Sequence, residues 1–299
     1  MRYILSAIAT AITFVSAASG AGPQLSIPVQ ITHSINDSPA PSPDGKRLVY
    51  LSVVAGKEQL FLMDVDGSNA VQITRDDADH EDPAWSPDGG KIAFVYMANG
   101  RQSIATVDTA GGNLDLLTPP EQKTIHPNWS ADSRRIIYCT NDDIAPPRKN
   151  TSQIMAIDVA SRKFETLIQG GINTYGSWSP DGRHIVFRKI IGEENSEVFV
   201  ADADGGHPRN LTNNPFFDGW PAWSPDGTQI AFASNRRGHG YQIFIMAADG
   251  GNPRVVALTE GRGTAPRWST DGKSLYFPNC TEKDYGVDCQ IYLARLAGP

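Results

Sequence analysis

The sequence has few cysteines, no basic stripe and, after its first residues, no long apolar run. Its three cysteines form no C-x-x-C pair, and no histidine stands beside them at the spacing of a zinc site. The formal net charge is −7 and no segment concentrates lysine and arginine, which argues against nucleic acid as a partner. No later segment approaches the roughly 20 apolar residues of a membrane span. The G-x-S-x-G motif of serine hydrolases is also missing.

The apolar residues at the start of the chain predict an export signal. Arg2 supplies a positive charge, Tyr3 to Ala18 is an apolar run, and "SAASGAG" offers the small residues that signal peptidase prefers. We therefore expect a signal peptide over residues 1–21 and a protein that is periplasmic or secreted after cleavage.

The cysteine positions agree with an oxidising compartment. Cys280 and Cys289 flank "TEKDYGVD" between two predicted strands of one hairpin, so their side chains could meet across the strand ends. A structural disulfide is favoured over a metal pair, which lacks further ligands nearby. Cys139, inside "RIIYC", is expected to be a buried free thiol.

One short motif occurs six times and divides the chain into repeats of roughly 44 to 49 residues, a period typical of propeller blades. The copies read "PSPDG", "WSPDG", "WSADS", "WSPDG", "WSPDG" and "WSTDG", with serines at Ser42, Ser86, Ser130, Ser179, Ser224 and Ser269. Two runs of bulky β-formers follow each copy, then a Gly-rich turn and a third run that in most repeats ends in "LT" or "IT". With the residues that lead into the motif, every repeat holds four strands.

The repeats predict an all-β fold, a six-bladed β-propeller of four-stranded blades over residues 22–299. The blades are expected at about 39–74, 82–118, 126–169, 175–212, 220–259 and 265–299. The sixth repeat lacks its "LT" strand, whereas an unattached "PVQIT" at 28–32 matches "AVQIT" at 70–74. We therefore expect strand 28–32 to complete the last blade and close the ring.

The motif itself is interpreted as a structural turn. In Ser-Pro-Asp-Gly, proline presets φ, aspartate can accept hydrogen bonds from nearby amides, and glycine takes the positive φ that closes the hairpin. The tryptophan that precedes it in five copies is expected to pack between neighbouring blades.

Repeats of the form "PAWSPDG..IAF.S......QIF.MDADG...LT" resemble the WD40-like (PD40) propeller repeats of the TolB family of periplasmic proteins, from about residue 28 to the end. The resemblance implies a six-bladed propeller that recognises other proteins of the cell envelope. TolB proteins also carry an α/β domain before the propeller, and here few residues separate the signal from the first strand. We therefore expect a propeller-only relative that lacks that N-terminal domain.

Ligand sites of propellers lie at the mouth of the central channel, where the loops between successive blades converge. The position three residues before each motif tryptophan, or before its replacement Pro41, differs in every repeat, although a structural role would demand similar residues. This column holds Ser38, Asp82, His126, Tyr175, Trp220 and Ala265. Together with the aromatic loop "NNPFFDGW", it predicts a binding site of Asp82, His126, Tyr175, Phe216, Phe217, Asp218 and Trp220.

Two functions fit these residues. The aromatic side chains would anchor a protein partner, which makes the chain a non-catalytic recognition or scaffold module, a monomer that binds envelope proteins. The alternative is a propeller enzyme, a saccharide lyase or hydrolase with a metal or acid/His site at the channel mouth. His80, Glu81, Asp82 and His126 are the candidate ligands of a divalent cation such as calcium. A solvated acidic loop that binds nothing is the competing interpretation of the same residues.

Overall fold

The computed structural model describes residues 26–33, 36–140, 151–193, 195–238, 240–283 and 286–296. The signal peptide expected over 1–21 lies outside these ranges. Within them, no helix combines the length and the apolar character that a membrane crossing requires.

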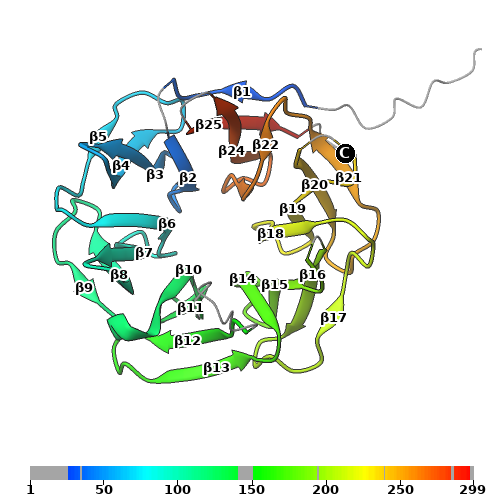
Figure 1. Cartoon of the computed structure of the whole chain (residues 1–299), viewed down its shortest axis with the longest axis horizontal. Helices are drawn as coiled ribbons and strands as arrows, with labels where there is room; N and C mark the ends of the chain where they lie inside the picture. Colours follow the sequence, from blue (N-terminus) through cyan, green and yellow to red (C-terminus); the bar gives the residue numbers. More distant parts are fainter. Residues whose placement is uncertain are drawn as a thin grey trace, which may run out of the picture.

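Six antiparallel sheets stand around a central channel as the blades of a propeller (Figure 1). Five of them have four strands in chain order, from the channel outwards. These are β2 (Asn36–Pro41), β3 (Arg47–Val54), β4 (Lys57–Asp64) and β5 (Val71–Gln72); β6 (Asp79–Trp85), β7 (Lys91–Ala98), β8 (Arg101–Asp108) and β9 (Asp115–Leu116); β10 (Thr124–Trp129), β11 (Arg135–Thr140), β12 (Ile154–Asp158) and β13 (Phe164–Ile168); β14 (Ile172–Trp178), β15 (His184–Ile190), β16 (Ser196–Asp202) and β17 (Arg209–Asn210); and β18 (Asp218–Trp223), β19 (Gln229–Ser234), β20 (Gln242–Ala247) and β21 (Arg254–Ala257). One short 3-10 helix, η1 (Pro120–Gln122), joins two blades. The predicted all-β, six-bladed architecture is confirmed.

The sixth blade combines both ends of the described chain. Its strands are β22 (Arg262–Gly263), β23 (Arg267–Trp268), β24 (Ser274–Lys283), β25 (Gly286–Arg295) and the N-terminal β1 (Val29–Gln30). The short β22 and β23 both pair with β24, and β1 pairs antiparallel with β25, with Val29 opposite Leu293. The N-terminal strand therefore closes the ring, as the sequence predicts.

The hydrophobic core lies between neighbouring blades. In β7, the four residues from Ile92 to Val95 are all buried. Because successive side chains of a strand point to opposite faces, such an unbroken apolar run fits a sheet that is covered on both sides. One cluster joins Leu60 of the first blade to Trp85 and Phe94 of the second.

The repeated motif forms the expected turn. In the second blade, Ser86 Oγ donates to Asp88 Oδ1 at 2.6 Å and accepts from the backbone N–H of Lys91 at 2.9 Å. Gly89 closes the turn with φ 74°. The third blade keeps the same turn without proline and glycine, because Ser133 adopts φ 58° in place of glycine.

The motif tryptophans contact the preceding blade. Trp129 donates its Nε1–H to the carbonyl of Ala84 at 3.1 Å, and Trp268 donates to the carbonyl of Ala222 at 3.0 Å. These hydrogen bonds link the innermost strands of adjacent blades, so the rings help to hold the blades in register around the channel.

Candidate functional site

The same backbone distortion recurs on the inner side of every blade. The six column residues of the sequence analysis all have positive φ, between 41° and 56°. In the first five blades the register between the inner strand and its neighbour shifts at this point, as in a β-bulge. A bulge breaks the alternation of the strand and re-aims its side chain, here towards the channel.

Left-handed backbone costs about 1–3 kcal/mol for most residues, and it is unusual for large side chains. Glycine would suit this position best. The propeller nevertheless places His126, Tyr175 and Trp220 there. Since the backbone is alike in all six blades while the side chains differ, the strain points to a role for these side chains at the channel.

All six column residues line one open cavity, which we call the channel mouth, with a volume of about 270 Å³. A second, much narrower cavity of about 20 Å³ shares Asp82, His126, Tyr175 and Trp220 with it and extends to Asn128, beside the motif turns. The column therefore surrounds the entrance of the central channel.

Carboxyl groups of the first two blades form one side of the mouth, which we call the acidic arc: Asp37, Glu58, Glu81 and Asp82. Burial, reinforced by the neighbouring carboxylates, raises the pKa of Glu81 to about 7. Burial likewise raises the pKa of Asp82 to about 6, against the opposing charge of Arg267. The pKa values of Asp37 and Glu58 are also raised, chiefly by burial.

His126 lies between the acidic arc and the aromatic residues. Its Nε2 is 3.7 Å from Asp82 Oδ2, and its ring stacks on Tyr175 with the centroids 3.6 Å apart. Burial, together with the charges of Arg188 and Arg267, lowers the pKa of His126 well below its ordinary value. The imidazole is therefore neutral, and its buried Nδ1 has no hydrogen-bond partner in the described part of the chain.

Tyr175 and Trp220 line the opposite side of the mouth, and Phe217 packs against Trp220 without lining the cavity; we call these three residues the aromatic wall. Trp220 lies 5.8 Å from Tyr175 and 5.2 Å from Phe217 between ring centroids. The Arg188 guanidinium lies against all three rings, at 4.8 to 5.6 Å from their centroids. Its Nε donates to Thr174 Oγ1 at 2.9 Å, which holds it in place.

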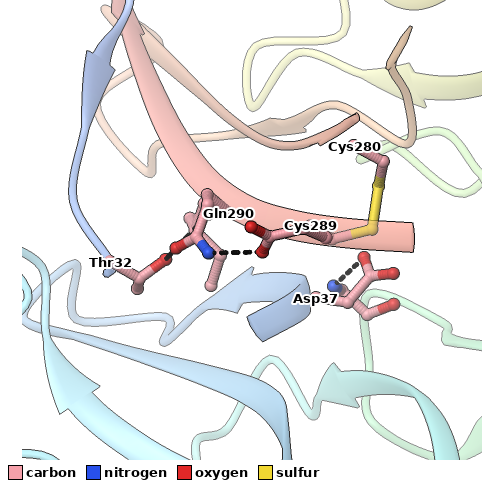
Figure 2. Close-up of a disulfide and its surroundings, with 8 residues drawn as sticks. Thr32, Asp37, Cys280, Cys289 and Gln290 are labelled. Atoms are coloured by element: carbon pink, nitrogen blue, oxygen red, sulfur yellow. Dashed lines mark hydrogen bonds between the residues drawn. A yellow bond between two sulfur atoms is a disulfide. The ribbon is translucent and has the colours of Figure 1, made fainter. Parts of the chain in front are cut away.

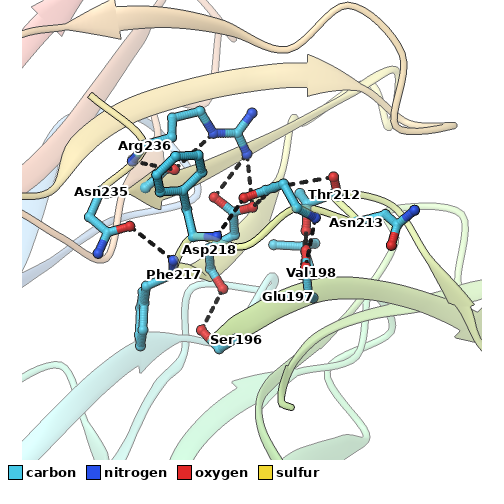
Figure 3. A network of polar contacts seen from close by, with 12 residues as sticks. Ser196, Glu197, Val198, Thr212, Asn213, Phe217, Asp218, Asn235 and Arg236 are labelled. Atoms are coloured by element: carbon cyan, nitrogen blue, oxygen red, sulfur yellow. Dashed lines mark hydrogen bonds and ion pairs between the residues drawn. The ribbon is translucent and has the colours of Figure 1, made fainter. Parts of the chain in front are cut away.

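Two predicted site residues lie elsewhere, and both stand two positions before the column. Asp218 is fully buried within the fifth blade (Figure 3), where its carboxylate accepts from Arg236 Nη2 at 2.8 and 2.9 Å. Asn214 Nδ2 also donates to Asp218, at 2.6 Å. His80 is fully buried in the second blade, with Nδ1 3.1 Å from Thr74 Oγ1. Both side chains fix the loop that enters their blade.

The two phenylalanines of the predicted loop also lie apart from the mouth. Neither Phe216, which is 41% exposed, nor Phe217, which packs against Trp220, lines the cavity. The backbone N–H groups of Phe216 and Phe217 donate to the side chains of Asn214 and Asn235, both at 2.9 Å. The loop is therefore pre-organised by its own polar side chains.

The predicted metal ligands are not gathered into one cluster. Asp82 and His126 meet at the mouth and Glu81 lines it, but His80 faces the blade interior. Among the described residues, these four do not bring three ligand atoms within 4.8 Å of one another. A divalent ion at the mouth would therefore need further ligands or a rearrangement of these side chains.

The cysteine pair lies beside the mouth. Cys280 and Cys289 face each other in the register of β24 and β25 and are joined by a disulfide, with the Asp37 carboxylate next to it (Figure 2). The disulfide therefore links the two strands of the sixth-blade hairpin at a point close to the first blade. Cys139 is a buried free thiol, and burial raises its pKa to about 12.

The structure adds residues that the sequence analysis did not single out: Asp37, Glu58, Arg188 and Arg267. Arg267 follows the column residue Ala265 by two positions and lines both cavities. Asp37 directly precedes its column residue, as Glu81 does. The column alone could therefore have indicated Asp37, whereas Glu58 and Arg188 come from other strands and carry no signal in the repeat.

The fold and the mouth together define a six-bladed β-propeller with a polar and aromatic ring at its channel entrance. The family model of the TolB beta propeller domain (PD40) matches residues 23–195 and 149–295. The chain therefore belongs to the TolB β-propeller family. A search of curated proteins gives no match.

Solved structures share this fold at low sequence identity. TolB from Acinetobacter baumannii is 24% identical, with a TM-score of 0.67; the match covers 79% of this chain and 57% of that one, so the chain spans little more than half of its length. A putative TolB from Agrobacterium tumefaciens is 22% identical, with a TM-score of 0.67 and coverage of 91% and 97%. An oligogalacturonate lyase in complex with manganese is 15% identical, with a TM-score of 0.62 and coverage of 93% and 94%.

Proposed function

We propose that this propeller is an exported, monomeric recognition module that binds a segment of a cell-envelope protein at its channel mouth, in the periplasm or after further secretion. The observation that supports it best is the column of left-handed residues. Six blades of one backbone present six different side chains to one cavity, including the strained His126, Tyr175 and Trp220. Aromatic residues in a preformed cavity are typical anchors of protein recognition. Membership of the TolB propeller family supports the same role.

The aromatic wall provides the test. In-cell crosslinking of the tagged, exported protein should capture one envelope protein in stoichiometric amount, and the Trp220→Ala/Phe217→Ala double variant should lose it. Phe164→Ala is the control, because Phe164 is an aromatic residue of the outer strand β13 that lines neither cavity.

Trp220 also packs against the core between the fifth and sixth blades, so its removal could lower stability. Thermal unfolding of the double variant is therefore measured alongside. Ala265→Trp blocks the mouth without removing any packing, since the fifth blade already carries tryptophan at the same backbone position. Capture that survives both the double variant and Ala265→Trp would contradict the proposal.

A saccharide lyase or hydrolase is the second candidate function, and the Asp82–His126 pair beside raised carboxyl pKa values favours it. The four candidate metal ligands do not bring three ligand atoms close together in the described chain. We therefore expect metal analysis after dialysis against calcium or manganese to find no stoichiometric ion. A stoichiometric ion that Asp82→Asn and His126→Gln lose, but the exposed control His184→Gln keeps, would favour the enzyme. Turnover of uronate oligosaccharides would then decide for it.

A further inference from the structure

We infer that the channel mouth binds a short zwitterionic peptide, with its ammonium group at the acidic arc and its carboxylate at Arg267. The inference rests on the proposed function only in placing the ligand at the mouth, because it names a free peptide with both termini charged rather than a segment within a longer chain. Its basis is that the two sides of one cavity carry groups of opposite charge that form no ion pair within 4.0 Å among the described residues.

The acidic side lacks counter-ions. Asp37, Glu58 and Glu81 line the mouth, and in the described chain no lysine or arginine nitrogen lies within 4.0 Å of their carboxylates. The nearby Lys57 pairs instead with Asp79, at 2.8 Å. Like charges that crowd together in a partly desolvated site favour the binding of a cation, which relieves their repulsion.

The positive side is equally unpaired. Arg267 lines both cavities, and desolvation lowers the pKa of its guanidinium, while Asp82 opposes this effect from beyond ion-pair distance. Arg188 likewise has no carboxylate within 4.0 Å among the described residues; its contacts are Thr174 and the aromatic wall. A guanidinium held at a cavity without a carboxylate is a site for an anionic group of a ligand.

His126 offers a third, uncharged feature between the two sides. We assign the proton of the neutral ring to Nε2, because this nitrogen lies 3.7 Å from Asp82 Oδ2, and the assignment leaves Nδ1 as an acceptor. That buried Nδ1 has no partner in the described chain. A ligand that carries an N–H between its charged ends, as a peptide does, would supply the missing donor.

The arrangement also fixes the orientation of the ligand. The Arg188 guanidinium lies against the rings of the aromatic wall and does not line the mouth, so its positive charge disfavours a ligand cation next to those rings. The ammonium is therefore directed to the first two blades and the carboxylate to the sixth. The wall remains for an apolar or aromatic side chain between them. The cavity has a volume of about 270 Å³ and is open to solvent, so it can take a peptide of two or three residues.

The test is calorimetric titration of the full protein with the tripeptide Ala-Phe-Ala and two derivatives that each lack one charge. We expect the C-terminal amide and the N-acetyl form to bind about tenfold more weakly or worse than the free tripeptide. In Arg267→Gln, the amide should bind as well as the free tripeptide. In Glu81→Gln, the penalty for acetylation should shrink.

Controls separate folding from recognition. Arg267→Lys keeps the positive charge and should keep the discrimination against the amide, while Arg183→Gln changes an exposed arginine at a motif turn and should alter nothing. Equal binding of all three peptides, or no binding of the free tripeptide to the folded protein, would overturn the inference. Capture of an envelope protein without tripeptide binding would leave the proposed function standing alone. Tripeptide binding without capture of an envelope protein would support the inference and contradict the proposed function.

Discussion

The Glu81 carboxyl group lies at the channel mouth, and its pKa is raised there to about 7 from the ordinary value of 4.5. Burial is the largest cause, and the charges of Asp82, Glu58, Asp79 and Asp37 add to it. The folded protein thus keeps an ionisable group where its charged form is unfavourable. Such a cost to stability is typical of residues that are retained for binding rather than for folding.

Replacing Glu81 by glutamine should stabilise the protein at alkaline pH. Because the folded-state pKa lies above the ordinary value of 4.5, the folded protein holds a proton that the unfolded chain has released. The free energy of unfolding of the wild type therefore falls as the pH rises from 4.5 to about 7. Glu81→Gln removes this contribution, so its melting temperature should exceed that of the wild type at about pH 8 and match it at about pH 4.

Thermal unfolding across this pH range checks the prediction. Glu121→Gln serves as the matched control, because Glu121 is exposed on η1 and its replacement should leave the pH profile unchanged. If Glu81→Gln follows the wild-type profile in parallel, the loss of stability belongs to other groups of the mouth.

At the scale of the element, the inner strands explain which site residues the sequence could predict. The column stands out in the sequence because the other positions of the repeat are nearly constant while this position varies. His80 and Asp218 were misplaced for one reason: each stands two positions before a column residue, where a regular strand would put both side chains on the same face. The bulge turns the column residue towards the channel and leaves the residue two positions before it inside the blade. A bulge of this kind depends on the pairing of two strands, so no single-strand pattern reveals it.

The same inner-strand position is polar and buried in five blades. It holds Asn36, His80, Thr124, Asn173 and Asp218, each at most 3% exposed. In the second and third blades it meets a threonine of the preceding outer run, with His80 3.1 Å from Thr74 Oγ1 and Thr124 3.1 Å from Thr118 Oγ1. Only His80 and Asp218 of this set are candidate site residues in the sequence, because polarity alone does not distinguish a buried structural group from an exposed functional one.

At the scale of the whole molecule, the ring depends on one non-covalent seam. The threonine of the repeated "LT" or "IT" accepts a hydrogen bond from a backbone N–H of the adjoining strand: Thr74 from Leu60 at 2.9 Å, and Thr118 from Ile104 at 2.9 Å. Thr32 makes the equivalent bond to Ile291 N–H at 2.9 Å, although 259 residues separate the two in the chain. Sequence similarity between "PVQIT" and "AVQIT" predicted the closure because the same threonine serves both sheets.

Thr32→Val should weaken the contact between β1 and β25 that closes the ring. Valine has the shape of threonine without its hydroxyl, so the buried Ile291 N–H loses its partner at a cost of about 1–3 kcal/mol in the free energy of unfolding. Thr118→Val removes the equivalent bond inside the second blade and should cost a similar amount. Hydrogen exchange distinguishes the two variants. Thr32→Val should accelerate exchange of the β25 amides that face β1, because only non-covalent contacts hold β1 to β25. Thr118→Val should leave those amides protected. Unchanged protection of β25 in Thr32→Val would mean that the backbone pairing of Val29 and Gln30 closes the ring without the threonine.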